Sequence, residues 1–151
     1  MRIEQIQHIG LVWLAWALAA TGVAYAQTAT EKVILSFGNF PHGANPYAPV
    51  IRDADGNFYG TTYQGGQANA GVVYKLSASG QQTVLYSFTG GADGLNPYSG
   101  VIRSSTGNLY GTTYQGGTAN SGVVYRVSPS GQENVLYSFT AAPTGATPTR
   151  A

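Results

Sequence analysis

The segment Asp-Ala-Asp-Gly-Asn at residues 53–57 places oxygen-bearing side chains at alternate positions, as the beginning of a calcium-binding loop does. An EF-hand loop, however, has Gly at its sixth position and a bidentate Glu at its twelfth. Gly56 comes two positions too early for this pattern, and no Glu stands at the twelfth position. Asp, Gly and Asn are also the residues that hairpin turns require. We therefore predict a turn here, and neither a metal site nor a cofactor.

His42 is the one histidine outside the N-terminal segment, and the chain has no Cys. General acid–base or nucleophilic catalysis needs a positioned partner, and no Cys or repeated carboxylate pair is present to provide one. Because His42 stands between Pro41 and Gly43, we interpret it as a solvated loop residue. The sequence predicts no catalytic residue and a protein that is not an enzyme.

Two segments combine an aromatic ring with side-chain amides beside a Gly-Gly turn. Aromatic faces with amide donors and acceptors are chemistry that holds sugars or peptides. The competing interpretation is structural, because a repeated Tyr commonly packs between sheets. Arg52 and Arg103 recur before a turn, and we interpret both as solvated or turn-bracing. The candidate ligand contacts are Tyr63, Gln64, Asn69, Tyr114, Gln115 and Asn120.

These segments belong to an internal repeat. Phe37, Phe88 and Phe139 are each separated by 51 residues. With the same offset, the run N-F-Y-G-T-T-Y-Q-G-G at residues 57–66 returns as N-L-Y-G-T-T-Y-Q-G-G at residues 108–117. Such self-similarity is typical of repeat architectures.

Within each period, the sequence indicates four strands separated by turns. In the third strand of the second copy, Val123, Tyr125 and Val127 alternate with Val124 and Arg126, as a half-buried strand requires. Breaks rich in Gly, Ser, Asn and Pro predict hairpin connections between the strands. The predicted strands of that copy span residues 98–103, 108–113, 122–127 and 134–139.

Four antiparallel strands in about 50 residues match one blade of a β-propeller. We predict an all-β protein with two complete, blade-like repeats at residues 38–88 and 89–139 and a leading strand at 33–37. Two blades would form an incomplete propeller, since propellers generally have four to eight. A β-solenoid or an array of stacked hairpins is the alternative.

The repeated motif itself resembles a known family. The run G-N-L-Y-G-T-T-Y-Q-G-G is followed by S-G-V-V-Y-R-V-S-P-S-G and V-L-Y-S-F, and D-G-L-N-P-Y stands between copies. These motifs resemble the GloVer tandem repeat of bacterial exported proteins over nearly all of residues 33–140. The resemblance implies propeller-like repeats, often in large arrays with varied surface-anchoring tails, and no shared enzymatic activity.

Composition and the N-terminus complete the prediction. The chain has 151 residues, 21 Gly, 11 Tyr and a net charge of +1, which suits strands and turns and offers no basic face for nucleic acid. Arg2, an apolar stretch at 9–20 and Ala24-Tyr25-Ala26 predict a signal peptide at residues 1–26. An uncleaved membrane anchor is the alternative. A linker at 27–32 and a Pro, Thr and Ala-rich tail at 140–151 flank the repeats.

The sequence therefore predicts an exported protein, located in the periplasm, on the cell surface or outside the cell. Its first function hypothesis is a non-enzymatic scaffold or binding surface for protein or glycan, with no stable membrane span after cleavage. The second is a fragment of a propeller hydrolase or lactonase whose catalytic blades are missing. The third is a self-assembling structural or adhesive protein, in which homo-oligomers close a propeller. Among the explanations for only two copies, we favour a fragment of a longer array over a degenerate paralogue or self-closure.

Overall fold

The computed structural model describes residues 31–38 and 41–140. The predicted signal segment, most of the predicted linker and nearly all of the predicted tail lie outside these ranges. Every regular element within the ranges is a β-strand, and they contain no helix able to cross a membrane. The predicted all-β class is confirmed.

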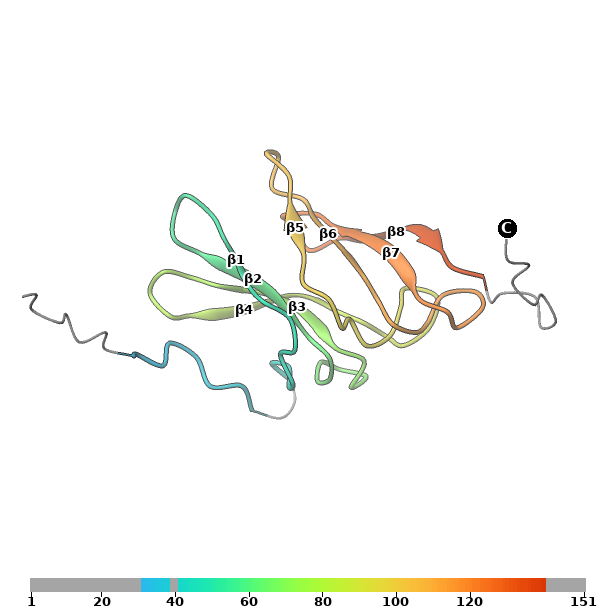
Figure 1. Cartoon of the computed structure of the whole chain (residues 1–151), viewed down its shortest axis with the longest axis horizontal. Coiled ribbons are helices and arrows are strands. Elements are labelled where there is room, and N and C mark those ends of the chain that lie inside the picture. The colour runs from blue at the N-terminus through green and yellow to red at the C-terminus, as the bar shows by residue number, and fades with distance from the viewer. Residues whose placement is uncertain (1–30, 39–40, 141–151) are drawn as a thin grey trace, which may run out of the picture. The chain divides into compact units, whose positions relative to one another are not determined.

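The strands form two four-stranded antiparallel sheets in tandem, each a simple meander in which consecutive strands are neighbours (Figure 1). Both sheets belong to one compact unit that begins at Val33. The antiparallel pairing agrees with blade-like repeats and rules out the parallel rungs of a β-solenoid for the described residues. Sheet 1 contains β1 (Ile51–Arg52), β2 (Phe58–Thr62), β3 (Val72–Leu76) and β4 (Gln82–Ser87), and sheet 2 contains β5 (Ile102–Arg103), β6 (Leu109–Thr112), β7 (Val123–Val127) and β8 (Glu133–Ser138).

Local chemistry fixes the hairpins. Asp53 closes the turn between β1 and β2, because its carbonyl accepts from the Gly56 N–H at 3.1 Å and its Oδ1 accepts from the Asn57 N–H at 2.9 Å. In sheet 2, Ser104 caps the equivalent turn through its Oγ, which accepts from the Asn108 N–H at 3.1 Å. The calcium-like segment is thus a hairpin turn, as predicted.

Glycine in the repeated Tyr-Gly-Thr-Thr motif makes room for a tyrosine ring. Gly60 pairs with Tyr74 on the neighbouring strand, and a Cβ at Gly60 would lie 2.6 Å from the Tyr74 hydroxyl oxygen. Gly111 and Tyr125 repeat this arrangement at 2.4 Å. The absent side chain lets each tyrosine lie flat across the adjacent strand, which explains why glycine stands inside a strand that would otherwise disfavour it.

Each sheet has two faces that differ in what they contact. The front face carries Val72, Tyr74 and Leu76 in sheet 1, and the 51-residue offset places Val123, Tyr125 and Val127 on the front face of sheet 2. The back face carries Val73 and Phe88 in sheet 1. Burial alternates along β7 as the sequence predicts. The main core lies where the back face of sheet 1 meets the front face of sheet 2, joining Tyr59, Ala70, Val73, Phe88, Val101, Leu109, Val123, Tyr125 and Val127.

Two predicted strands differ from the structure. The first strand of the second copy was expected from residue 98 but begins at Ile102, because Asn96 has a positive φ of 55° and Pro97 has no N–H to donate to a ladder. Residues 33–37 form no strand. Residues 33–37 are equivalent to the end of β4, which pairs with β3 of the same sheet. No described residues form an equivalent of β3 with which residues 33–37 could pair. Leu35 and Phe37 instead pack on the front face of sheet 1.

Candidate ligand-binding site

The repeated tripeptide Asn-Pro-Tyr leads the chain away from each sheet just before its first strand. Ala44 forms a bridge to Gln64, and regular pairing resumes only at Ile51, so the residues between them project from the edge. Asn45 holds the start of this loop, since its carbonyl accepts from the Tyr63 N–H at 3.0 Å. The loop leaves Tyr47 exposed, and the equivalent loop leaves Tyr98 exposed.

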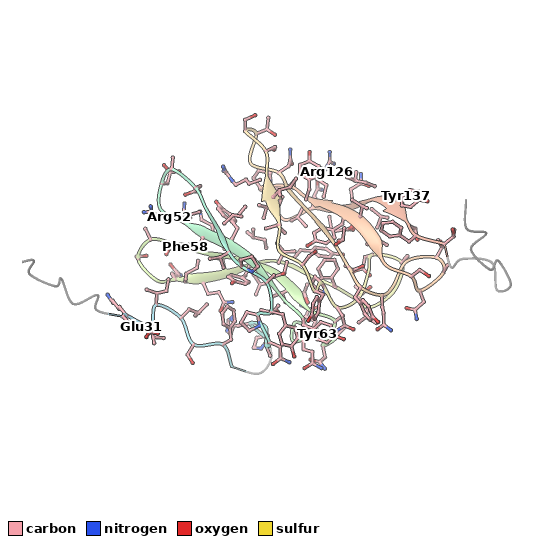
Figure 2. The ribbon with its side chains drawn as sticks, viewed as in Figure 1. Glu31, Arg52, Phe58, Tyr63, Arg126 and Tyr137 are labelled. Carbon is pink, nitrogen blue, oxygen red and sulfur yellow. The ribbon has the colours of Figure 1, made fainter. Side chains whose placement is uncertain are left out.

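Tyr47 and Tyr98 both contact Tyr63. Tyr63 itself lies just past the end of β2 (Figure 2). Ring centroids are 5.5 Å apart for Tyr47 and Tyr63, 5.5 Å for Tyr47 and Tyr98, and 6.1 Å for Tyr63 and Tyr98. These separations are within the range of favourable aromatic pairs. Because Tyr98 belongs to the second repeat, the cluster crosses from one sheet to the next.

Tyr114 extends the cluster. It is 65% exposed, and with Tyr63 and Tyr98 it lines a hollow of about 360 Å³. That volume is at the lower end of ligand pockets, and all three lining residues are tyrosines. We call Tyr47, Tyr63, Tyr98 and Tyr114 the tyrosine patch. It offers ring faces for apolar contact and hydroxyl groups that both donate and accept hydrogen bonds.

The hydrogen bonds that hold this patch come from the backbone and from asparagine. The Asn96 amide donates to the carbonyl of Tyr63 at 2.7 Å, and the Asn96 N–H donates to the carbonyl of Ala70 at 2.9 Å. Asn96 is buried, and its two bonds reach from the second repeat to the first. Thr61 adds a bond in the opposite direction, from its hydroxyl to the Ser99 carbonyl at 2.9 Å. The rings are therefore positioned by buried polar contacts, which favour a fixed geometry.

The structure divides the six predicted contacts. Tyr63 and Tyr114 lie in the tyrosine patch. Asn69 and Asn120 instead brace the Gly-Gly turns, each with a positive φ and with its Oδ1 accepting an N–H bond at 2.9 Å from Gly65 or Gly116.

Gln64 and Gln115 have their backbone in the bridges that close the loops. The Gln64 Oε1 also accepts from the Asn45 amide at 2.6 Å. The amides that the sequence associated with ligand contact thus contribute mainly to the turns. Sequence reasoning missed Tyr47 and Tyr98, although the recurrence of Asn-Pro-Tyr at the repeat offset contained the signal.

The remaining candidates form no second site. His42 is exposed, and its carbonyl accepts from the Gln82 amide at 2.9 Å. Arg52 stacks over Phe58 within its own hairpin, with 5.8 Å between guanidinium carbon and ring centroid. Arg103 lies 5.4 Å from the Tyr59 ring of the other sheet and braces the boundary between sheets. Residues 31–38 and 41–140 contain no cluster of three metal-ligating side chains.

A hollow of about 230 Å³ beside Arg103 is lined by charged groups of both signs, including Asp53 and Lys75. Hydrogen bonds from the Asn57 side chain and backbone and from the Tyr59 hydroxyl lower the pKa of Asp53 to about 2. This carboxylate is therefore ionised and already committed to its turn and to Tyr59, 3.0 Å away. We therefore interpret the hollow as a structural feature of the hairpin and of the boundary between the two sheets.

Two four-stranded sheets at a constant offset, with aromatic side chains repeated at the same offset, define a tandem β-repeat protein. The sequence model of a protein family, the Gloeobacter/Verrucomicrobia repeat, matches residues 19–151 of this chain. Since the match covers most of the chain, the chain belongs to this repeat family, and the family resemblance seen in its motifs is confirmed. A search of curated proteins gives no match.

The family match begins at residue 19, inside the predicted signal segment. Residues 22–25 read Gly-Val-Ala-Tyr, similar to the Gly-Val-Val-Tyr at 71–74 and 122–125 that leads into β3 and β7. The end of the predicted signal segment therefore also resembles the repeat. Cleavage after Ala26 would separate these residues from the rest of the repeat.

Proposed function

We propose that this protein is an exported, non-enzymatic binding module whose tyrosine patch binds carbohydrate. The observation that carries the proposal is the patch itself, in which four tyrosines from both repeats come together, three of them exposed and Tyr63 half-buried. Exposed aromatic clusters are costly to maintain in water and mark interaction sites. Export is supported by the signal-like pattern at residues 1–26.

The chemistry of the patch favours a sugar over a charged ligand. A sugar ring presents C–H groups on its faces and hydroxyl groups on its rim. Tyrosine matches both, because its ring accepts apolar contact while its hydroxyl exchanges hydrogen bonds. The hollow is lined by Tyr63, Tyr98 and Tyr114 alone, so no charged side chain in its lining would select an ionic ligand. The spacing of the rings across two sheets fits an oligosaccharide better than a single sugar.

The test is a glycan array probed with the purified wild-type chain, followed by titration of any sugar that binds. Tyr98→Ala removes the ring at the centre of the patch, and binding should weaken by at least about tenfold, as expected for an anchor worth about 1.4 kcal/mol or more. Tyr137→Ala is the matched control, because this tyrosine is similarly exposed but lies on β8 outside the patch (Figure 2). At a protein concentration where the chain is monomeric, it should bind as wild type does.

Three results would count against the proposal. The first is no glycan signal above background, and the second is equal loss of binding in the Tyr98 and Tyr137 variants. The third is saturable binding of peptides, but not of sugars, that Tyr98→Ala abolishes. For export, the N-terminal residue of the protein recovered outside the cytoplasm should be Gln27. A chain that retains residues 19–26 would overturn the predicted cleavage site.

A further inference from the structure

The contact between the two sheets has a repeated aromatic pair at its centre. Phe88, on the back face of sheet 1, is completely buried and lies edge-on to Tyr125, on the front face of sheet 2, with 5.0 Å between ring centroids. Val73 packs beside it from the same back face. This internal contact shows how one repeat joins the next.

The front face of sheet 1 receives the same kind of contact from a short segment. Phe37 lies 5.2 Å from Tyr74 in an edge-on arrangement, and these residues are the equivalents of Phe88 and Tyr125. Leu35 packs on the same face. The segment at 33–37 forms no strand, so side-chain packing holds it there, and neighbouring Val33 and Ile34 remain exposed. It covers only part of the face, since Val50 is exposed while its equivalent Val101 is buried.

The back face of sheet 2 carries the surface equivalent to the Phe88 side of the internal contact. No described residue covers it. Tyr137 and Phe139 are 55% and 40% exposed, and Ile102 on β5 is 71% exposed. Their rings are already arranged as in sheet 1, since Tyr137 and Phe139 are 5.1 Å apart at 80° and Tyr86 and Phe88 are 5.2 Å apart at 85°. The surface is therefore preorganised to pack against a ring in the way that Phe88 packs against Tyr125 inside the chain.

We propose that the back face of sheet 2 binds the front face of sheet 1 in a second copy of this chain. The partner is identified by continuity with the internal contact, because that front face carries Tyr74 in the place of Tyr125. Each copy would use a different face toward each neighbour, which is a head-to-tail interface that closes into a ring or grows into a filament. The incoming sheet must displace Leu35 and Phe37, so this segment competes with assembly.

The first test measures mass by light scattering over a range of concentrations of the full chain. Wild type should shift from the monomer mass to a multiple of it as concentration rises. Phe139→Ser should move this transition to at least about tenfold higher concentration, because a buried phenylalanine contributes 1.5–3 kcal/mol. Phe37→Ser should move it to lower concentration, since the competing segment is weakened. Asn134→Ser should leave it unchanged, because Asn134 is exposed and its equivalent Thr83 stays exposed beside the internal contact.

The second test determines the direction of pairing. The bond from Thr61 to Ser99 crosses the internal contact, and its equivalents between copies are Thr112 and Ala48. The chain has no Cys, so Thr112→Cys and Ala48→Cys can each be joined by a short bismaleimide without background. A mixture of the two variants should form cross-linked pairs, whereas either variant alone should not.

Several outcomes would overturn the proposal. One is a wild-type chain that stays monomeric at all concentrations, as expected if further residues of a longer chain cover this face. Another is a Phe139 variant that assembles at the same concentration as the Asn134 variant does. A third is cross-linking of each single-cysteine variant as efficiently as of the mixture, which would indicate a symmetric interface in place of a head-to-tail one.

Discussion

Sheet 1 and sheet 2 have nearly the same sequence, the same strand order and the same turns, yet their equivalent residues experience different environments. Phe88 is 0% exposed and Phe139 is 40% exposed, although the residues from 84 to 88 and from 135 to 139 are identical. The front faces of both sheets are largely buried, whereas the back faces differ. The comparison shows that contacts within a repeat follow from its own sequence, while the burial of its faces depends on its neighbours.

The largest effect should separate the two phenylalanines. Phe88→Ala leaves a cavity in the core against Tyr125, and such substitutions cost about 3–5 kcal/mol of unfolding free energy. Phe139→Ala removes a partly exposed ring, and we expect a loss of about 1 kcal/mol or less. Chemical denaturation of both variants, at a protein concentration where the wild-type chain is monomeric, measures the difference. Equal losses would show that the two back faces are equally buried in solution.

The Gly-Gly turns lie within each repeat, so substitutions there should destabilise the two repeats equally. Gly65 and Gly116 have positive φ values of 86° and 82°, and a Cβ on either would lie 2.5 Å from a backbone Cα, that of Gly43 or Gly94. Alanine at either position should therefore cost about 2 kcal/mol, from the strained backbone and the overpacking together. The two losses should agree within about 0.5 kcal/mol, a typical uncertainty for independent sites. Unequal losses in urea denaturation would mean that the turns depend on their neighbouring repeat.

The smallest effect concerns a residue in which the repeats differ. Burial, together with the charge of Asp93, raises the pKa of Glu133 to about 7, and its equivalent in sheet 1 is Gln82. The folded chain holds this proton more tightly than the unfolded chain, in which glutamate titrates near 4.5, so ionisation lowers stability as the pH rises through this interval. Glu133→Gln should stabilise the protein at pH 8 by less than about 1 kcal/mol, because solvent reduces the penalty, and leave it unchanged at pH 4.

Denaturation of the Glu133 variant and of wild type at both pH values checks this prediction. The buried Oε1 of Glu133 has no hydrogen-bond partner among the described residues, which is consistent with the direction of the shift. Asn134→Gln is a suitable control, because it changes the exposed neighbour without adding or removing a charge. A stabilisation that is the same at pH 4 and pH 8 would contradict the electrostatic explanation.

The sequence predicted the parts of the fold that depend on short-range patterns. The offset between Phe88 and Phe139 identified the repeat, and the alternation from Val123 to Val127 identified β7 and its buried face. The sequence predicts too long a first strand for the second repeat, because Tyr98 and Val101 favour β-structure. Asn96 and Pro97, just before them, turn the chain out of the sheet. Local β-propensity does not reveal where a strand stops pairing with its neighbour.

The site was predicted less completely for the same reason. Tyr63 and Tyr114 were recognised from their place beside the Gly-Gly turns, but the two other tyrosines join them only because adjacent repeats meet. Tyr98 is 35 residues from Tyr63 in sequence and 6.1 Å from it in space. Asn69 and Asn120 were candidates for contact because their amides can bind ligands, and the positive φ that commits them to turns is visible only in the structure.

The edge-on contact between Phe88 and Tyr125 also bears on how such a protein changes over generations. One repeat carries both halves of the contact, so duplication of a single unit supplies a new copy together with the surface that joins it to the last. A longer array needs no compensating substitutions, whereas a change of the shared phenylalanine in one copy weakens only one junction. Gene duplication can therefore adjust the number of tyrosine patches in coarse steps, while point mutation refines each patch on its own.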